Sequence, residues 1–380
     1  MRYLFPLNPY NQQRQFQKPV WVYPCHLAAY ATYLRNEGHE VVWDSGNFLL
    51  VKSGLGVNEV GKTAKFIMDS IVIENDFQID VPFEKLPFPD REFTDAKNKR
   101  WQSYGNYKLH PATHMMTSNL CWWGKCTFCI DTAKLQAGEK RGVRSVDHVM
   151  QEIDDLIRLG FREVFDDSGT FPIGEWLEEF CEKMNERPKK GIHESLLWPH
   201  GNFTFVPKSH FSKSRELISV GCNMKPISEK VVPFKLMKRA GFRFMLVGVE
   251  SANQNTIDKI RKGQESSKVI ENMKAMNDAG LEVHLTSMFG YPWETHEDAM
   301  RTVNEIHYLL RKGYVKTAQA SVYMPPRTAP PANADAQKYV QMVYDIYKDP
   351  RYWFRKALDL KRWEDFTYLL KRLPLVRHAE

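Results

Sequence analysis

The stretch "SSKVIENMKAMNDAGLEVHLTSMFG", residues 266–290, joins the two patterns that decide the fold. Residues 266–280 carry apolar side chains at helical spacing and end in glycine, which predicts a helix. Residues 281–290 form a short apolar run, which predicts a strand. A helix that leads directly into a strand is the repeating unit of a parallel sheet.

The same alternation continues in both directions along the chain. Helices are predicted at 145–160, where Ser145 is the candidate N-cap and Gly160 ends the helix, and at 173–187, 228–241 and 295–313. Strands are predicted at 112–120, 161–165, 242–251 and 315–324. Between them, 195–206 and 216–224 are both strand candidates, and one of the two is expected to be an inserted hairpin or lid.

The third strand–helix unit is completed by the strand that contains Cys222, which makes six units. Strands that alternate with helices predict an α/β fold with a parallel sheet, here a partial (βα)6 TIM-like barrel. In such barrels the chemistry lies at the carboxyl ends of the strands. Functional residues are therefore expected just after each strand.

Three cysteines follow the first strand in "SNLCWWGKCTFCID", residues 118–131. Cys121, Cys126 and Cys129 are soft ligands in a tight loop, which suits zinc or an iron–sulfur cluster and does not suit calcium or magnesium. A structural zinc site needs a second pair of ligands, and the plant-type ferredoxin spacing C-x4-C-x2-C needs a fourth cysteine. Cys181 has helical spacing with apolar neighbours, which favours a core position.

Three alternatives stay open at this point. The thiols could be incidental, although three so close together are uncommon by chance. They could serve an electron-transfer or zinc-binding protein. "GVNEVGKT", residues 56–63, also matches the phosphate-loop pattern G-x4-G-K-[ST], but no clear nucleotide-binding sheet is predicted around it.

Composition and charge argue against three classes of protein: nucleic-acid-binding, membrane and secreted proteins. The chain has 380 residues and a net charge of +7, but the basic residues are spread thinly, so nucleic-acid binding is not expected. No run of eighteen apolar residues and no signal-peptide pattern are present, so neither a membrane partner nor secretion is expected. We expect a reducing cytoplasm, in which Cys25, Cys181 and Cys222 are free thiols.

Several motifs, in order, resemble those of the radical S-adenosylmethionine (SAM) superfamily over residues 113–326. They are the cysteine loop with Phe128 before its last cysteine, "FDDSGTF", "LVGVESANQNTIDKIRKG", "MFGYPWET" and "YMPPRTAPP". The chain looks closest to the class with an N-terminal cobalamin-binding domain. Two features depart from the family pattern: the first two cysteines are separated by four residues instead of the common three, and the last motif lacks the usual proline–glycine turn.

The resemblance implies a mechanism and its cofactors. Cys121, Cys126 and Cys129 would ligate a [4Fe-4S] cluster, and SAM would chelate the open iron. Reductive cleavage of SAM would give a radical that abstracts hydrogen from a substrate, which the sequence does not identify. An electron donor such as flavodoxin or ferredoxin would supply the electron. The residues expected to contact SAM are Phe128, Asp166, Asp167, Ser168, Glu250 and Ser251, together with Gly290 and Tyr291 through their backbone, and no further catalytic residue is identified.

The parts outside the barrel are predicted to be small. Residues 1–90 are expected to form a reduced cobalamin-binding-like, Rossmann-like α/β segment and linker, residues 105–330 the radical SAM barrel, and residues 331–380 a helical extension. The family's cobalt-ligand motif D-x-H-x-x-G is missing from this chain and the N-terminal segment is short. Tightly bound cobalamin is therefore not expected.

Overall fold

The computed structural model describes most of the chain. The described residues are 2–6, 23–44, 71–72, 81–99, 101–103, 107–187, 218–225, 232–324, 335–360 and 365–367. Three stretches discussed above lie outside them: the strand candidate at 195–206, the phosphate-loop match at 56–63 and the proline-rich end of the last motif, "YMPPRTAPP". None of the helices in the described part is long and apolar enough to cross a membrane.

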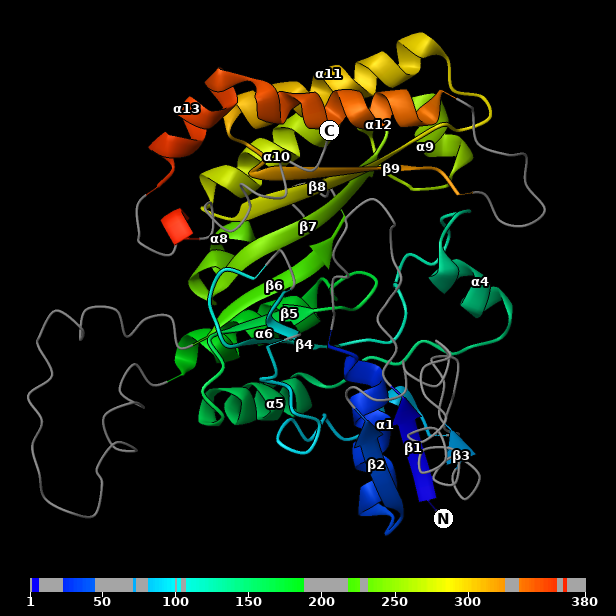
Figure 1. The fold of residues 1–380 in the computed structure, drawn as a ribbon, viewed down its shortest axis with the longest axis vertical. Coiled ribbons are helices and arrows are strands. Elements are labelled where there is room, and N and C mark those ends of the chain that lie inside the picture. The colour runs from blue at the N-terminus through cyan, green and yellow to red at the C-terminus, as the bar shows by residue number, and fades with distance from the viewer. Residues whose placement is uncertain are drawn as a thin grey trace, which may run out of the picture.

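A six-stranded parallel sheet forms the centre of the fold (Figure 1). Its strands, which pair in sequence order, are β4 (Ala112–Met115), β5 (Glu163–Asp166), β6 (Ser219–Met224), β7 (Phe242–Glu250), β8 (Glu282–Phe289) and β9 (Thr317–Val322). Every neighbouring pair is parallel, and β4 and β9 remain the two edges of the sheet. The predicted partial (βα)6 barrel is therefore confirmed, with the third strand running through Cys222 as expected.

Helices connect the strands and cover the sheet. They are α4 (Ile130–Gln136), α5 (Val146–Arg158), α6 (Glu175–Glu186), α8 (Phe234–Arg239), α9 (Gln254–Lys259), α10 (Val269–Asp278) and α11 (His296–Lys312), followed by α12 (Ala336–Tyr344) and α13 (Pro350–Leu358). One-turn helices are η1 (Phe83–Lys85), η2 (Trp101–Ser103), η4 (Ser266–Lys268) and η5 (Asp345–Lys348). Helices α10, α11 and α12 form one layer, whereas α4 lies apart from it (Figure 1).

Local chemistry explains where the long helices begin and end. The Ser145 hydroxyl accepts a hydrogen bond from the His148 N–H at the start of α5, as its sequence predicts. Thr295 and Asp298 form a reciprocal capping box at the start of α11, and the left-handed Gly313 ends that helix. These contacts fix the residues at which α5 and α11 begin and the residue at which α11 ends.

The core lies between the sheet and its helices. An aromatic group formed by Phe171, Trp176, Phe180 and Phe242 packs α6 against the central strands. Cys181 on α6 and Cys222 on β6 are both fully buried in this core. The expectation that Cys181 is a core residue is confirmed, and Cys222 is enclosed in the same way.

Among the described residues, a smaller parallel sheet and the helix α1 precede the barrel. The sheet has the order β2-β1-β3, with β1 (Arg2–Pro6), β2 (Glu40–Asp44) and β3 (Ile71–Val72), and α1 (Cys25–Asn36) lies beside it (Figure 1). Helix α1 and strand β2 follow each other directly within residues 25–44. Tyr23, Cys25 and Ala28 belong to the same hydrophobic core as residues of α5.

A buried ion cluster joins the linker to the barrel. Arg91 and Arg144 both pair with Glu152 on α5, and the three side chains are at most 5% exposed. The two guanidinium groups also donate to the carbonyls of His114 and Met116, at the end of β4. Removing one partner of such a cluster leaves a buried charge unpaired, at a cost of about 3–5 kcal/mol. The cluster therefore anchors the strand that leads into the cysteine loop.

Candidate functional site

The loops that follow the strands meet at one edge of the large sheet. Because all six strands are parallel, their carboxyl ends lie at the same edge. The cysteine loop follows β4, the "FDDSGTF" segment begins at the end of β5, and Lys225 follows β6. The segments after β7 and β8 bring Glu250 and Tyr291 to the same edge. Strand topology therefore assembles residues that lie up to 170 positions apart in the chain.

The cysteine loop is held by backbone contacts on both of its sides. The Cys121 N–H donates to the Asp131 carboxylate at 2.8 Å, and the Cys129 N–H donates to the Cys126 carbonyl at 3.1 Å. Across the loop, the Thr127 N–H donates to the Ile260 carbonyl at 3.0 Å. These contacts fix the backbone of all three cysteines before any ligand is bound.

The three thiols are half-buried and lie close to groups that stabilise thiolates. Cys129 is the N-cap of α4, and the N–H groups of its first turn hold the pKa of this thiol down while burial raises it overall. Burial likewise raises the pKa of the Cys126 thiol, and the positive charges of Lys262 and Lys225 oppose that rise. The Cys121 thiol donates to the Thr170 hydroxyl at 3.2 Å.

Two buried lysines face the cysteine loop. Lys262 pairs with Glu250 at 2.6 Å, and this carboxylate keeps the pKa of Lys262 above its ordinary value although burial alone would lower it. Lys225 donates to the Lys262 carbonyl at 2.6 Å, and burial together with the charge of Lys262 lowers the pKa of Lys225 to about 8. The positive potential of this pair favours negative charge at the thiols or on a bound carboxylate.

The acidic segment after β5 holds the chain that enters the cysteine loop. The buried Asp166 carboxylate accepts from the Thr117 N–H at 2.8 Å and from the Ser168 N–H at 3.1 Å. The Ser168 hydroxyl oxygen accepts from the Ser118 N–H at 2.9 Å. Burial raises the pKa of Asp166 to about 6. The side chains of these two predicted SAM contacts are bonded to backbone N–H groups. Asp167, between them, is an exposed residue, but desolvation of its carboxyl and the charges of Asp166 and Asp131 raise the pKa of that carboxyl to about 7.

The residues after β7 and β8 that were predicted to contact SAM have different surroundings in the structure. Ser251 is fully buried and its hydroxyl points to Thr302 of α11, 3.4 Å away, so it belongs to the packing of the barrel wall. Glu250 remains at the edge with a left-handed backbone angle, φ +65°. Gly290 has φ +90°, a conformation that favours glycine, and its N–H donates to the Glu294 carboxylate at 2.6 Å.

An aromatic group lines the remaining side of the edge. Phe128, from the cysteine loop, packs with Ile260, Tyr291 and Tyr323, and the rings of Tyr291 and Tyr323 are 4.7 Å apart. Burial and the negative charge of Glu250 raise the pKa of Tyr291. The Tyr291 side chain is fully buried, yet its hydroxyl has no hydrogen-bond partner within the part of the chain that the structure describes. Buried hydroxyls normally have a partner, so this atom is placed to meet a polar group of a ligand.

The three thiols and the Tyr291 hydroxyl can be compared with the metal groups and ligands that such side chains bind. Among the described residues, no three or more His, Cys, Asp or Glu side chains are grouped to hold one metal ion. In a cubane cluster each cysteine binds a different iron, so its ligands lie farther apart than those of one ion. Three half-buried thiols on one fixed loop therefore fit an iron–sulfur cluster. The unpartnered Tyr291 hydroxyl fits a polar ligand beside it.

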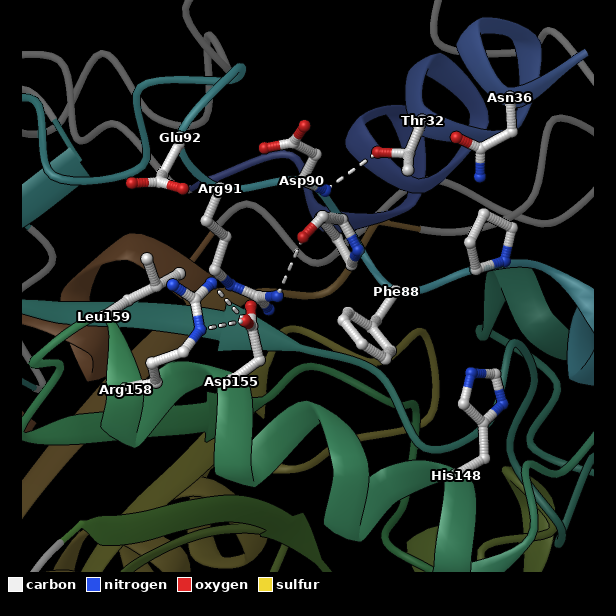
Figure 2. Close-up of a pocket in the computed structure, with 12 residues that line it drawn as sticks. Thr32, Asn36, Phe88, Asp90, Arg91, Glu92, His148, Asp155, Arg158 and Leu159 are labelled. Carbon is white, nitrogen blue, oxygen red and sulfur yellow. Dashed lines mark hydrogen bonds and ion pairs between the residues drawn. The ribbon is translucent and has the colours of Figure 1, made fainter.

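A cavity of about 450 Å³ lies elsewhere, between α1, the linker at 87–92 and α5 (Figure 2). Thr32, Phe88, His148 and Arg158 are among the residues that line it, and Arg158 pairs with Asp155 at its edge. No residue of the cysteine loop lines this cavity. It belongs to the junction between the N-terminal segment and the barrel.

Sequence reasoning missed four residues of the site. Lys225, Lys262, Thr170 and Asp131 all contact the cysteine loop or its neighbours, and none belongs to the predicted set. The sequence could have indicated the two lysines. Lys225 directly follows a predicted strand, and Lys262 lies in the turn at the end of the motif that begins in the strand predicted at 242–251. Thr170 and Asp131 act through a single thiol and a single N–H, which no spacing in the sequence indicates.

Comparisons with known proteins agree with this arrangement. The model of the Radical SAM superfamily matches residues 115–306, half of the 380-residue chain. A protein of Pyrococcus horikoshii named as an uncharacterized methyltransferase is 26% identical over 190 residues, which are 50% of this chain and 35% of that protein. The chain therefore spans about a third of the length of this curated relative.

Solved structures are also similar. The radical SAM methyltransferase TsrM of Kitasatospora setae is 14% identical with a TM-score of 0.42, covering 57% of this chain and 36% of TsrM. The cobalamin-dependent radical SAM enzyme OxsB is 13% identical with a TM-score of 0.42, covering 87% of this chain and 45% of OxsB. TM-scores of this size do not bear on function.

Proposed function

The chain belongs to the radical SAM superfamily, and we propose that it cleaves SAM reductively and abstracts hydrogen from a substrate. The observation that carries this proposal is the set of three half-buried thiols on one fixed loop at the carboxyl edge of the sheet. A radical SAM domain implies a [4Fe-4S] cluster and SAM as cofactors. We propose Cys121, Cys126 and Cys129 as the three cluster ligands.

Three protein ligands leave one iron of a cubane cluster for SAM. When bound, cluster and SAM supply a one-electron cleavage that yields methionine and a 5′-deoxyadenosyl radical able to abstract hydrogen. The chain itself holds Cys121 in position through Asp131 and Thr170. The loop and the aromatic group around Tyr291 would keep water from the reacting atoms.

The SAM contacts that we propose form a smaller set than the sequence predicts. Phe128, Glu250, Gly290 and Tyr291 lie together beside Cys126 and Lys262, which supports them as contacts. Asp167 is the exposed residue directly after β5, and we propose its carboxylate for the methionine amine. We assign Asp166 and Ser168 to positioning the cysteine loop, and Ser251 to packing against α11.

Reaction and partners are part of the same proposal. The name of the Pyrococcus horikoshii relative makes methyl transfer the first reaction to test. The reaction requires a substrate and an external electron, for which we propose flavodoxin or ferredoxin as donor. The expectation that cobalamin is not tightly bound stays a prediction, which a corrinoid assay of the purified protein checks.

The cluster ligands can be tested by anaerobic reconstitution with iron and sulfide. We expect about four irons per chain in the natural protein, the content of one cubane cluster. Changing Cys121, Cys126 and Cys129 together to alanine is expected to abolish iron binding and the cluster's absorbance. Cys181→Ala is the matched control, because this thiol is buried in the core, and it is expected to keep the cluster. Full iron content in the triple variant would refute the assignment.

A further inference from the structure

A basic and aromatic surface covers the cysteine loop. We define the basic face as the exposed residues Lys125, Lys259 and Arg261 with the half-buried Trp123 and Trp293 between them. The Lys125 ammonium lies 5.0 Å from the Trp123 ring centre, and the Lys259 ammonium lies 5.1 Å from that of Trp293. The Trp123 indole N–H donates to the Arg261 carbonyl at 2.8 Å, which joins the two halves of the face.

The cations of this face have no carboxylate partner in the described part of the chain. Many other exposed cations are paired, for example Arg158 with Asp155 and Lys274 with Asp278. Lys125, Lys259 and Arg261 form no such ion pair there, and the nearby exposed Asp258 instead accepts from the Gln254 amide at 2.8 Å. The buried Lys225, whose ammonium lies 3.6 Å from the Trp123 ring centre, adds to the positive potential.

The basic face is also the surface next to the three thiols. Lys125 directly precedes Cys126, and the Thr127 N–H donates to the carbonyl of Ile260, the neighbour of both Lys259 and Arg261. The three cysteines are half-buried and lie on the same loop as Trp123 and Lys125, so a cluster on them would be close to this surface. Electron transfer weakens steeply with distance, and an electron from outside would therefore enter here.

We propose that the basic face is the docking surface for an acidic one-electron carrier protein that reduces the cluster. The inference rests on the proposed function and adds the site and charge of its electron donor. In the step the carrier loses one electron and the cluster gains one, with no bond made or broken. Complementary charge speeds the encounter, and tryptophan and arginine are enriched at interaction surfaces.

The test reverses the charge of the face and measures cluster reduction directly. The variant carries Lys125→Glu, Lys259→Glu and Arg261→Glu. The matched control carries Lys235→Glu, Lys338→Glu and Arg301→Glu, three exposed cations on α8, α12 and α11 without carboxylate partners among the described residues. Both variants change the net charge equally, and iron content is measured first. Reduced flavodoxin, an acidic carrier, and reduced methyl viologen, a small cation, are then mixed with each protein, and the bleaching of cluster absorbance is followed by stopped flow.

We expect the face variant to be reduced by flavodoxin about tenfold more slowly than the control at low salt, with a smaller difference at high salt. Reduction by methyl viologen is expected to be at least as fast as in the natural protein, which shows an intact cluster. Equal flavodoxin rates in the two variants would overturn the proposal. The proposal would also be overturned if the face variant kept its flavodoxin rate and lost the binding of a fluorescent single-stranded RNA. That result would assign the face to nucleic acid. Failure of the natural protein to load a cluster would instead contradict the proposed function.

Discussion

Tyr291 has a buried hydroxyl that the described part of the protein leaves unsatisfied. Its ring packs against Tyr323 and lies in one group with Phe128, so its position is fixed by apolar contacts alone. A buried unsatisfied hydroxyl lowers the stability of the protein by about 1–3 kcal/mol. A residue that destabilises the ligand-free protein in this way is best explained by a contact made only when a ligand is bound.

Tyr291→Phe is therefore expected to have opposite effects on stability and binding. The free energy of unfolding of the ligand-free protein should stay equal or rise, since no hydrogen bond is lost. The Kd for SAM of the cluster-loaded protein should rise about two- to tenfold, because one hydrogen bond of about 0.5–1.5 kcal/mol is lost. Urea unfolding and isothermal titration calorimetry measure the two quantities.

Tyr339→Phe provides the control for this change. The Tyr339 hydroxyl lies 2.9 Å from His296 Nδ1, far in the chain from the cysteine loop. We expect this variant to lose stability and to bind SAM normally. The assignment of Tyr291 is wrong if Tyr291→Phe loses stability and keeps the SAM affinity of the natural protein.

At the scale of the elements, the cysteine loop depends on the turn after α9. Gly263 has φ +62°, and a Cβ atom there would collide with the Trp123 ring. The indole of Trp123 in turn donates to the Arg261 carbonyl. The loop that carries the thiols and the turn that carries Lys262 are thus packed as one unit, with no room for a side chain at position 263.

Gly263→Ala is expected to weaken the hold on the cluster. The backbone strain costs about 1–2 kcal/mol, and the collision also displaces Trp123 and its loop. Release of iron from the reconstituted protein to a chelator should be faster than in the natural protein. Gly280→Ala is the control, because Gly280 has φ +85° but its Cβ would meet only the Lys238 side chain at 3.4 Å. Equal iron release from the two variants would show that the contact between the turn and the loop has no such role.

At the scale of the whole molecule, strand order and helix positions could be predicted well from the sequence. Apolar periodicity and caps such as Ser145 are local signals, so α5 and β7 lie where their patterns predict them. The same holds for the core position of Cys181, which follows from helical spacing.

The contents of the site could be predicted only in part. A motif places Asp166 and Ser168 near the cysteine loop, but it does not reveal that backbone N–H groups occupy both side chains. Glu152 lies within the apolar stripe of α5, a signal that could have revealed the buried cluster with Arg91 and Arg144. Contacts of this kind depend on loops that meet only after the sheet has formed.

One measurement tests the central claim most directly. Cluster-loaded protein is incubated anaerobically with SAM, with and without dithionite, beside the variant in which Cys121, Cys126 and Cys129 are alanine, and 5′-deoxyadenosine is measured by chromatography. Three thiolates leave one iron to bind SAM, so we expect 5′-deoxyadenosine and methionine from the natural protein only when the reductant is present. If the natural protein carries a complete cubane cluster and is reduced, yet forms no more 5′-deoxyadenosine than the variant, the claim that this chain cleaves SAM is contradicted.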